Sequence, residues 1–235
     1  MERLHFHEEL EQLKLTVLNM AALTQQAFEN AVRAYTHRDV DLAQKIIDGD
    51  KKINQIELEV DKQSLRLLAL EQPMARDLRM IMGNMKISNE LERIADQAVN
   101  IAERTIFLSQ YPPLEEIAAM DRLIDVSRQM LKKAVSSMRD MDAHTAKDVR
   151  NMDDQADEST LQVLKSLIEH MVADAPAIDS RRLKTRRSIQ TIIISRCLER
   201  VGDLSTNIGE HVAFIVEGIN IKHQKLREED PESSQ

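Results

Sequence analysis

Acidic side chains recur at helical spacing in two copies of one motif. Residues 91–103 read LERIADQAVNIAE and residues 198–210 read LERVGDLSTNIGE, with seven of the thirteen positions identical. We call these segments the first and second signature. Steps of four and three residues place side chains along one face of an α-helix. Each signature therefore builds an oxygen-rich column, which suits hard or borderline metal ions. The columns are Glu92, Asp96, Asn100 and Glu103 in the first, and Glu199, Asp203, Asn207 and Glu210 in the second.

A second acidic pair with the spacing [DE]-x-x-x-D precedes each signature. The pairs are Glu57 with Asp61 and Asp153 with Asp157. If the helices are antiparallel, Glu57 and Glu92 are offset by only about 7 Å along the bundle, at roughly 1.5 Å of rise per residue. Four carboxylates at one level repel one another unless something neutralises them. A divalent or trivalent cation is the simplest remedy, and a multinuclear site is possible because carboxylates can bridge two ions. Protonation or nearby arginines are the alternatives.

Those alternatives have support in the sequence. Acidic residues four apart are common on solvated helix faces. Arg93 and Arg200 each precede a signature aspartate by three residues, so ordinary surface ion pairs with Asp96 and Asp203 would also explain the pattern.

Composition restricts the class of protein. Of 235 residues, 42% are apolar and 31% charged, with only five Gly and five Pro, which favours long amphipathic helices over disorder. The net charge of −8 argues against nucleic-acid binding. A single cysteine permits no internal disulfide. We find no apolar run of the roughly 20 residues that a spanning helix needs, and no signal-peptide core, so we expect a soluble cytoplasmic protein.

Hydrophobic periodicity predicts helices and nothing else. The first expected helix ends near Thr36-His37. Five more are expected over about 39–70, 74–108, 114–138, 142–172 and 180–221. Asp39 is the expected N-cap of the second helix, which Gly49 interrupts. Tyr111-Pro112-Pro113 is the clearest break. We therefore predict an all-α fold of two tandem, similar three-helix bundles, over 1–110 and 114–221, with a disordered tail at 222–235.

Other chemistries find little support. Ferritin-type di-iron bundles use Glu-x-x-His pairs, and Glu2-x-x-His5 is the single match. Cys197 is turned away from the second column and is expected in the core. No Gly-rich phosphate loop is present. A basic cluster, Arg181, Arg182, Lys184, Arg186 and Arg187, is either a solvated helix start or a docking patch for an acidic partner or anionic lipid.

The two signatures resemble the paired motifs of the PhoU family of phosphate-transport regulators. The segment 71–79, EQPMARDLR, resembles the family's first-repeat pattern, whereas 179–184, DSRRLK, departs from it in the second half. The resemblance implies two similar three-helix bundles, contact with the phosphate ABC transporter ATPase and a membrane sensor histidine kinase, and restraint of the phosphate-starvation response. It also implies a homodimer, no enzymatic activity, and proximity to the membrane through partners only.

The resemblance further implies metal ions, iron clusters among them, at the acidic pairs. The first site would use Glu57, Asp61, Glu92 and Asp96, and the second Asp153, Asp157, Glu199 and Asp203. Two other interpretations stay open at this point. One is a metalloenzyme with multinuclear carboxylate sites, against which no general base, nucleophile or nearby histidine stands out. The other is a metal-free helical scaffold.

Overall fold

The computed structural model describes residues 2–172 and 178–219, and helices dominate this part of the chain. They are α1 (Glu2–His37), α2 (Val40–Glu71), α3 (Ala75–Ser109), α4 (Ala118–Asp140), α5 (Ala143–Arg150), α6 (Asp153–Val172) and α7 (Ile178–Glu217). No β-strand occurs within these described ranges, so the predicted all-α fold is confirmed. The tail that we predicted to be disordered lies outside the described residues.

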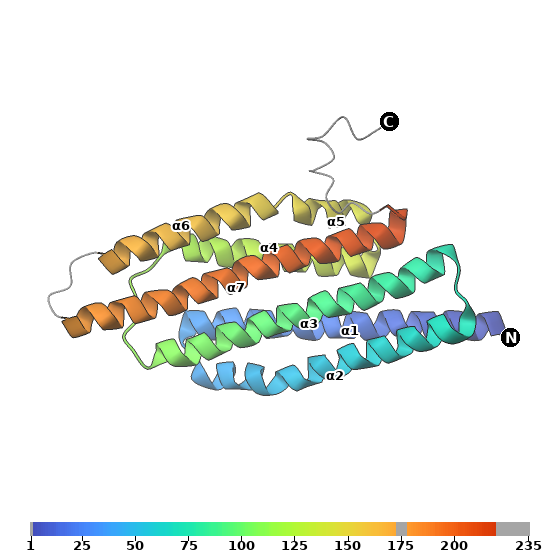
Figure 1. Cartoon of the computed structure of the whole chain (residues 1–235), viewed down its shortest axis with the longest axis horizontal. Coiled ribbons are helices and arrows are strands. Elements are labelled where there is room, and N and C mark those ends of the chain that lie inside the picture. Colours follow the sequence, from blue (N-terminus) through green and yellow to red (C-terminus); the bar gives the residue numbers. More distant parts are fainter. Residues whose placement is uncertain (1, 173–177, 220–235) are drawn as a thin grey trace, which may run out of the picture.

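The helices form two layers that meet mainly along α3 and α7 (Figure 1). Helices α1, α2 and α3 pack on one another, and α4, α5 and α6 pack on α7. Helix α3 lies antiparallel beside α7, and this pair makes the main contact between the halves, with a smaller contact of α1 with α4. The two signatures therefore lie side by side, because each occupies the middle of one of these two helices.

The core is aliphatic, as the shortage of aromatic residues requires. Fully buried side chains include Leu13, Met20 and Phe28 of α1 and Leu123 and Met130 of α4. Each contributes about 1.5–3 kcal/mol of burial free energy. The signature residues between the acids belong to this core, since Leu91, Ile94, Leu198 and Val201 are buried. Core packing thus fixes which face of α3 and α7 carries the acids.

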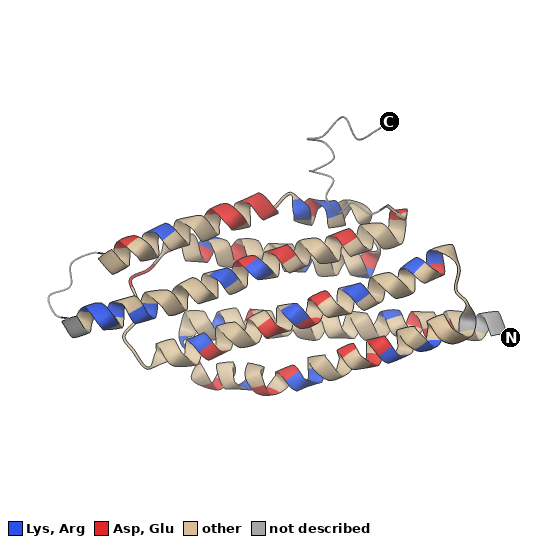
Figure 2. Cartoon of the chain, in the orientation of Figure 1, with Lys and Arg blue, Asp and Glu red and all other residues tan. Residues whose placement is uncertain are grey.

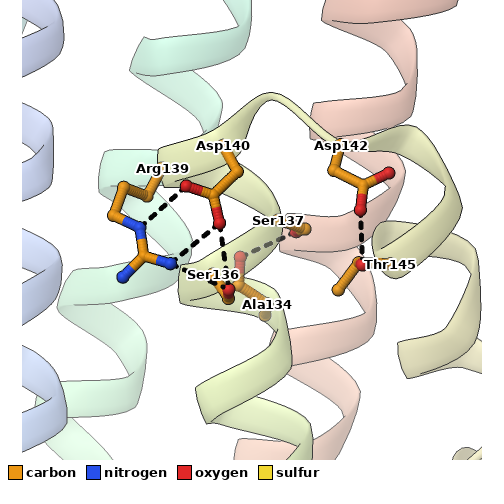
Figure 3. A network of polar contacts seen from close by, with 7 residues as sticks. All are labelled: Ala134, Ser136, Ser137, Arg139, Asp140, Asp142 and Thr145. Atoms are coloured by element: carbon orange, nitrogen blue, oxygen red, sulfur yellow. Dashed lines mark hydrogen bonds and ion pairs between the residues drawn. The ribbon is translucent and has the colours of Figure 1, made fainter.

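Equivalent turns start the middle helix of each half. Arg38 and Met141 adopt left-handed backbone conformations, and the next residue, Asp39 or Asp142, donates its N–H to a carbonyl five residues earlier. Both aspartates then cap the following helix, Asp39 at Leu42 N–H and Asp142 at His144 N–H. Asp142 also accepts a hydrogen bond from Thr145, and Asp140 binds Arg139 and Ser136 next to it (Figure 3). The predicted Asp39 cap is confirmed.

The second half departs from the expected helix plan at one place. We predicted an unbroken helix from about Asp142 to Val172, and this was wrong: α5 ends at Arg150 and α6 begins at Asp153. Asn and Asp side chains, which are poor in helix interiors and good near helix starts, fill 151, 153 and 154. Conversely, α2 continues without a break through Gly49. Within the described residues, no helix is long and apolar enough to cross a membrane.

Candidate metal-binding surface

The first acidic group spans α2 and α3. Partial burial raises the pKa of Glu92, and so do the charges of Asp96, Glu57 and Asp50. Loss of hydration and the neighbouring Asp61 likewise raise the pKa of Glu57. These mutual effects place the predicted acids within electrostatic reach of one another across the α2–α3 groove. The antiparallel arrangement inferred from spacing therefore brings Glu57 close to Glu92, whereas Asp61 acts on Glu57 of its own helix.

Sequence reasoning missed Asp50 as a member of this group. Its charge raises the pKa of both Glu92 and Asp96, after loss of hydration in each case. One carboxylate oxygen of Asp50 accepts a hydrogen bond from Asn54, 2.8 Å away. The other is buried and has no hydrogen-bond partner among the described residues. Asp50 lies seven residues, or two helical turns, before Glu57 and so on the same face of α2. This spacing could have revealed it from the sequence.

The second acidic group converges on Asp203. Loss of hydration and the charges of Asp153, Glu199 and Asp157 raise its pKa to about 6. Arg200 opposes this shift, and it also opposes the raised pKa of Asp96 in the first group. All four predicted acids of the second half are therefore close together, and Arg200 lies between the two groups.

Arginines line the hollow between the signatures. The surface groove between α3 and α7 is lined by Arg93, Arg196 and Arg200, together with Glu199, Asp203 and Asn207. Arg93 pairs with Glu90 at 3.0 Å and Arg196 with Glu199 at 2.6 Å. Arg93 therefore pairs with Glu90 and not with the signature aspartate Asp96, which we had considered as its partner. Basic and acidic segments are interspersed along α3, whereas on α7 the basic segments come first and the acidic ones follow (Figure 2).

The ends of the two columns do not extend the acidic groups. Asn207 donates to Glu90 across the α3–α7 contact at 3.4 Å, and Glu103 pairs with Arg104 at 3.4 Å. Glu90 lies 4.0 Å from His211, and both side chains are nearly buried. Burial would raise the pKa of Glu90, but His211, Asn207 and Arg93 outweigh it and leave that pKa below its ordinary range. This cluster joins the halves, and we assign it a structural role.

Two buried hydroxyls hold the signatures in register. Thr24 of α1 donates to the Leu91 carbonyl at 3.4 Å, and Ser127 of α4 donates to the Leu198 carbonyl at 2.9 Å. Leu91 and Leu198 are the first residues of the two signatures, so the two contacts are equivalent. Neither hydroxyl was singled out from the sequence, because a lone Thr or Ser on an apolar helix face has no distinctive spacing.

The basic cluster is divided between different tasks. Arg187 donates to the carbonyls of Pro112 and Pro113, and the Arg186 guanidinium lies 5.3 Å from the centre of the Phe107 ring. These two side chains therefore fasten the connection between the halves. Arg181 and Arg182 are exposed. Arg181 and Arg182 thus fit the predicted docking patch, whereas Arg186, although also exposed, lies against Phe107 of α3.

The oxygen donors of the two acidic groups are of the type that binds metal ions, but their side chains are not positioned around a common point. Each group is rich in carboxylate oxygens, carries raised pKa values, and in the first half holds a buried oxygen of Asp50 without a partner. Among the described residues, however, no three His, Cys, Asp or Glu side chains converge on a point where they could hold one ion. Metal binding would therefore require rotation of carboxylates, which the partly exposed positions permit. The ligand role of the eight predicted acids stays a prediction.

Comparison with known proteins identifies the family. The PhoU domain matches residues 17–105 and again 120–212. The chain belongs to the PhoU family. It is 35% identical over 221 residues to a phosphate-specific transport system accessory protein PhoU homolog of Aquifex aeolicus, covering 94% of this chain and 97% of the relative. The accessory protein PhoU of Escherichia coli K12 is 30% identical, covering 93% of this chain and 88% of that protein.

Solved structures of this family share the fold. The crystal structure of PhoU from Pseudomonas aeruginosa superposes with a TM-score of 0.85 at 31% identity, covering 91% of this chain and all of that one. The phosphate transport system regulatory protein PhoU from Streptococcus pneumoniae superposes with a TM-score of 0.81 at 26% identity, covering 92% and 99% of the two chains. The tandem arrangement of similar bundles is therefore shared across these PhoU proteins.

Proposed function

We propose that this protein is a cytoplasmic negative regulator of phosphate uptake and of phosphate-starvation signalling. The match of the PhoU domain to both halves, and of accessory PhoU proteins to nearly the whole chain, carries the proposal. The protein would act by contact with the phosphate ABC transporter ATPase and the sensor histidine kinase, and not by catalysis. It would work as a homodimer, as many members of the family do.

Metal ions bound by the two acidic groups form the second part of the proposal. Iron or another divalent or trivalent cation would neutralise the carboxylates around Glu92 and Asp203, whose pKa values are raised by loss of hydration and then by mutual repulsion. Each ion would join two helices, α2 with α3 and α6 with α7. Its presence would therefore stiffen the face on which the signatures lie and present a defined surface to a partner.

Elemental analysis of protein prepared without chelator tests the metal. We expect the double variant Asp96→Asn with Asp203→Asn to lose most of the bound metal. The matched control is Glu11→Gln with Asp125→Asn, which removes the same charge at two side chains that are each 68% exposed and lie outside both groups. Equal metal content in the parent and the signature variant would contradict the ligand assignment.

A deletion strain tests the regulatory role. Loss of this protein should derepress phosphate-starvation genes in high phosphate, and the parent gene should restore repression. Normal repression in the deletion strain would contradict the proposal. Binding of the purified ATPase and kinase, measured beside a phosphatase assay, separates contact from catalysis: phosphate release that Asp203→Asn abolishes would favour the metalloenzyme instead.

Arg181 and Arg182 offer a test of partner contact. Both are exposed at the start of α7, whereas Arg186 and Arg187 hold the connection between the halves. Charge reversal at Arg181 and Arg182 should weaken binding of an acidic partner surface with helicity unchanged. Equal affinities for both partners would leave these arginines as a solvated helix start.

A further inference from the structure

The turn between α2 and α3 exposes large apolar side chains at one end of the molecule. We define the apolar tip as Leu65, Leu70, Met74, Leu78 and Met82. Met74 is 79% exposed and Leu70 is 65% exposed. Scattered exposed leucines need no explanation, but five within eighteen consecutive positions form a patch. Such a patch on a soluble surface marks a contact with something apolar.

The local backbone holds these side chains outward. Leu78 and Met82 lie four residues apart and so share one face at the start of α3, and Met74 is the extended residue just before this helix. Pro73 fixes its own backbone, and the flanking Gln72 and Ala75 have φ of 43° and 44°, unusual for residues other than glycine. The turn lies at the same end of the elongated bundle as the N-terminus (Figure 1). The apolar tip therefore lies at the turn of the α2–α3 hairpin, at that end of the bundle.

Cations surround the apolar tip. Residues 62–86 contain five Lys or Arg and two Asp or Glu, whereas the whole chain has a net charge of −8. The cations are Lys62, Arg66, Arg76, Arg79 and Lys86, of which Arg66 pairs with Glu9 of α1 at 3.0 Å. Blue segments mark the start of α3 in Figure 2. The charge balance of this stretch is thus opposite to that of the chain as a whole.

The end of α7 enlarges the same surface. The Arg79 guanidinium lies beside Gly218, where an added Cβ would come within 3.3 Å of it, and Lys86 lies 5.8 Å from the centre of the Phe214 ring. Val216 and Ile219 near this helix end are exposed as well. Apolar and cationic side chains from both halves therefore meet at one end of the bundle.

We propose that the apolar tip docks directly on an anionic lipid surface. Apolar side chains that enter the headgroup boundary, flanked by Lys and Arg that attract anionic lipid, are the combination by which proteins bind at a membrane interface. An exposed apolar turn suits a broad lipid surface, whereas a partner helix would need a groove to receive it. This inference goes beyond membrane proximity through partners only and does not depend on the regulatory proposal.

Vesicle co-sedimentation tests this docking. The probes are vesicles of phosphatidylcholine alone and vesicles in which one third of the lipid is phosphatidylglycerol. The parent should bind the anionic vesicles and release them as salt rises, because exposed charges are screened. Met74→Glu with Leu78→Glu should weaken binding at least about tenfold. The matched control is Leu161→Glu with Ile168→Glu on α6, two similarly exposed apolar positions, which should bind like the parent.

A second variant guards against a folding defect. Lys62→Gln with Arg76→Gln changes only exposed cations, should keep parental helicity, and should also weaken binding to anionic vesicles. Parent protein that ignores anionic vesicles would overturn the proposal. So would equal loss in the α6 control, or a tip variant that binds vesicles normally while losing a purified protein partner, which would make the tip a protein-docking surface.

Discussion

The acidic groups of the two halves contain the same four predicted positions but are arranged differently. In the first half, the charges are spread along α2 and α3, with Asp50 added, and several carboxyl groups share the repulsion. In the second half, three acids act on Asp203, whose pKa rises to about 6. Equal spacing within each acidic pair therefore gives a distributed group on one side and a focused group on the other.

The broken helix explains the difference. In α2, Glu57 and Asp61 lie in mid-helix, whereas Asp153 stands at the first residue of α6, where the helix dipole favours negative charge. The break also lets α5 pack closely on α7, since an added Cβ at Gly209 would lie 2.6 Å from the Ala146 carbonyl oxygen. The second signature has Gly202 and Gly209 where the first has alanines. These glycines leave room for Met130 and Ala146, which pack against α7.

The largest expected effect is at Gly209. Gly209→Ala must push α5 away from α7, because the new methyl group meets backbone and not a flexible side chain. We expect a loss of about 2–3 kcal/mol in the free energy of unfolding, measured in urea. Gly202→Ala is the control, since its Cβ meets only the Met130 side chain at 3.1 Å, and it should change stability by less than about 1 kcal/mol. Equal effects at both positions would contradict the close α5–α7 approach.

The next effect concerns the two buried hydroxyls. Ser127→Ala should cost about 1 kcal/mol, because the hydroxyl contacts the Leu198 carbonyl at 2.9 Å and the Leu123 carbonyl at 2.8 Å. Thr24→Val should cost less, about 0.5 kcal/mol, since its contact with Leu91 is 3.4 Å. Urea unfolding checks both values. A larger loss from Thr24→Val would show that the first signature depends more on its anchor than the second does.

Much of this arrangement could be predicted from the sequence, because the signals are local and repeated. The doubled signature revealed the two halves, and the helical period placed Glu92 with Asp96 and Glu199 with Asp203 on single faces. The helix break at Asn151 was missed because the apolar period continues across it, although Asn151, Asp153 and Asp154 are local signals of a helix start. Asp50 and Ser127 were missed because their roles depend on which helix packs beside them. The different roles of Arg182, which is exposed, and Arg187, which binds Pro112 and Pro113, likewise depend on tertiary contacts that the sequence does not reveal.

A smaller effect is expected from the focused charge around Asp203. The folded chain holds the Asp203 proton more tightly than the unfolded chain does, because its pKa is raised to about 6. The resulting stability is fully present below about pH 4 and is lost as the pH rises through about 6. Solvent screens this exposed side chain, so Asp203→Asn should stabilise chelator-treated protein at pH 7 by about 1 kcal/mol and leave it unchanged at pH 4.

Asp96→Asn provides the matched comparison for that experiment. Loss of hydration and Asp50 raise the Asp96 pKa in the same direction, and Arg200 opposes the rise. Because the first group distributes its charge, we expect a smaller gain from Asp96→Asn at pH 7 than from Asp203→Asn. Thermal unfolding of both variants between pH 4 and pH 8 measures the difference. A larger gain from Asp96→Asn would reverse the contrast between a distributed and a focused group.

The smallest effect on stability is expected where the repeats differ most in chemistry. Glu90 of α3 occupies the position that Cys197 occupies in α7, each one residue before its signature. Burial raises the pKa of the Cys197 thiol to about 11, although Arg104 and Arg200 oppose the rise. Cys197→Ser should barely change the stability of the fold. Alkylation of the folded parent at pH 8 should be about a hundredfold slower than alkylation in urea, because the raised pKa leaves so little thiolate. The folded rate should keep climbing about tenfold for each unit up to pH 10. A rate that levels off near pH 9 would instead mean that the thiol faces water, and that the α3–α7 contact is looser around Cys197 than around Glu90.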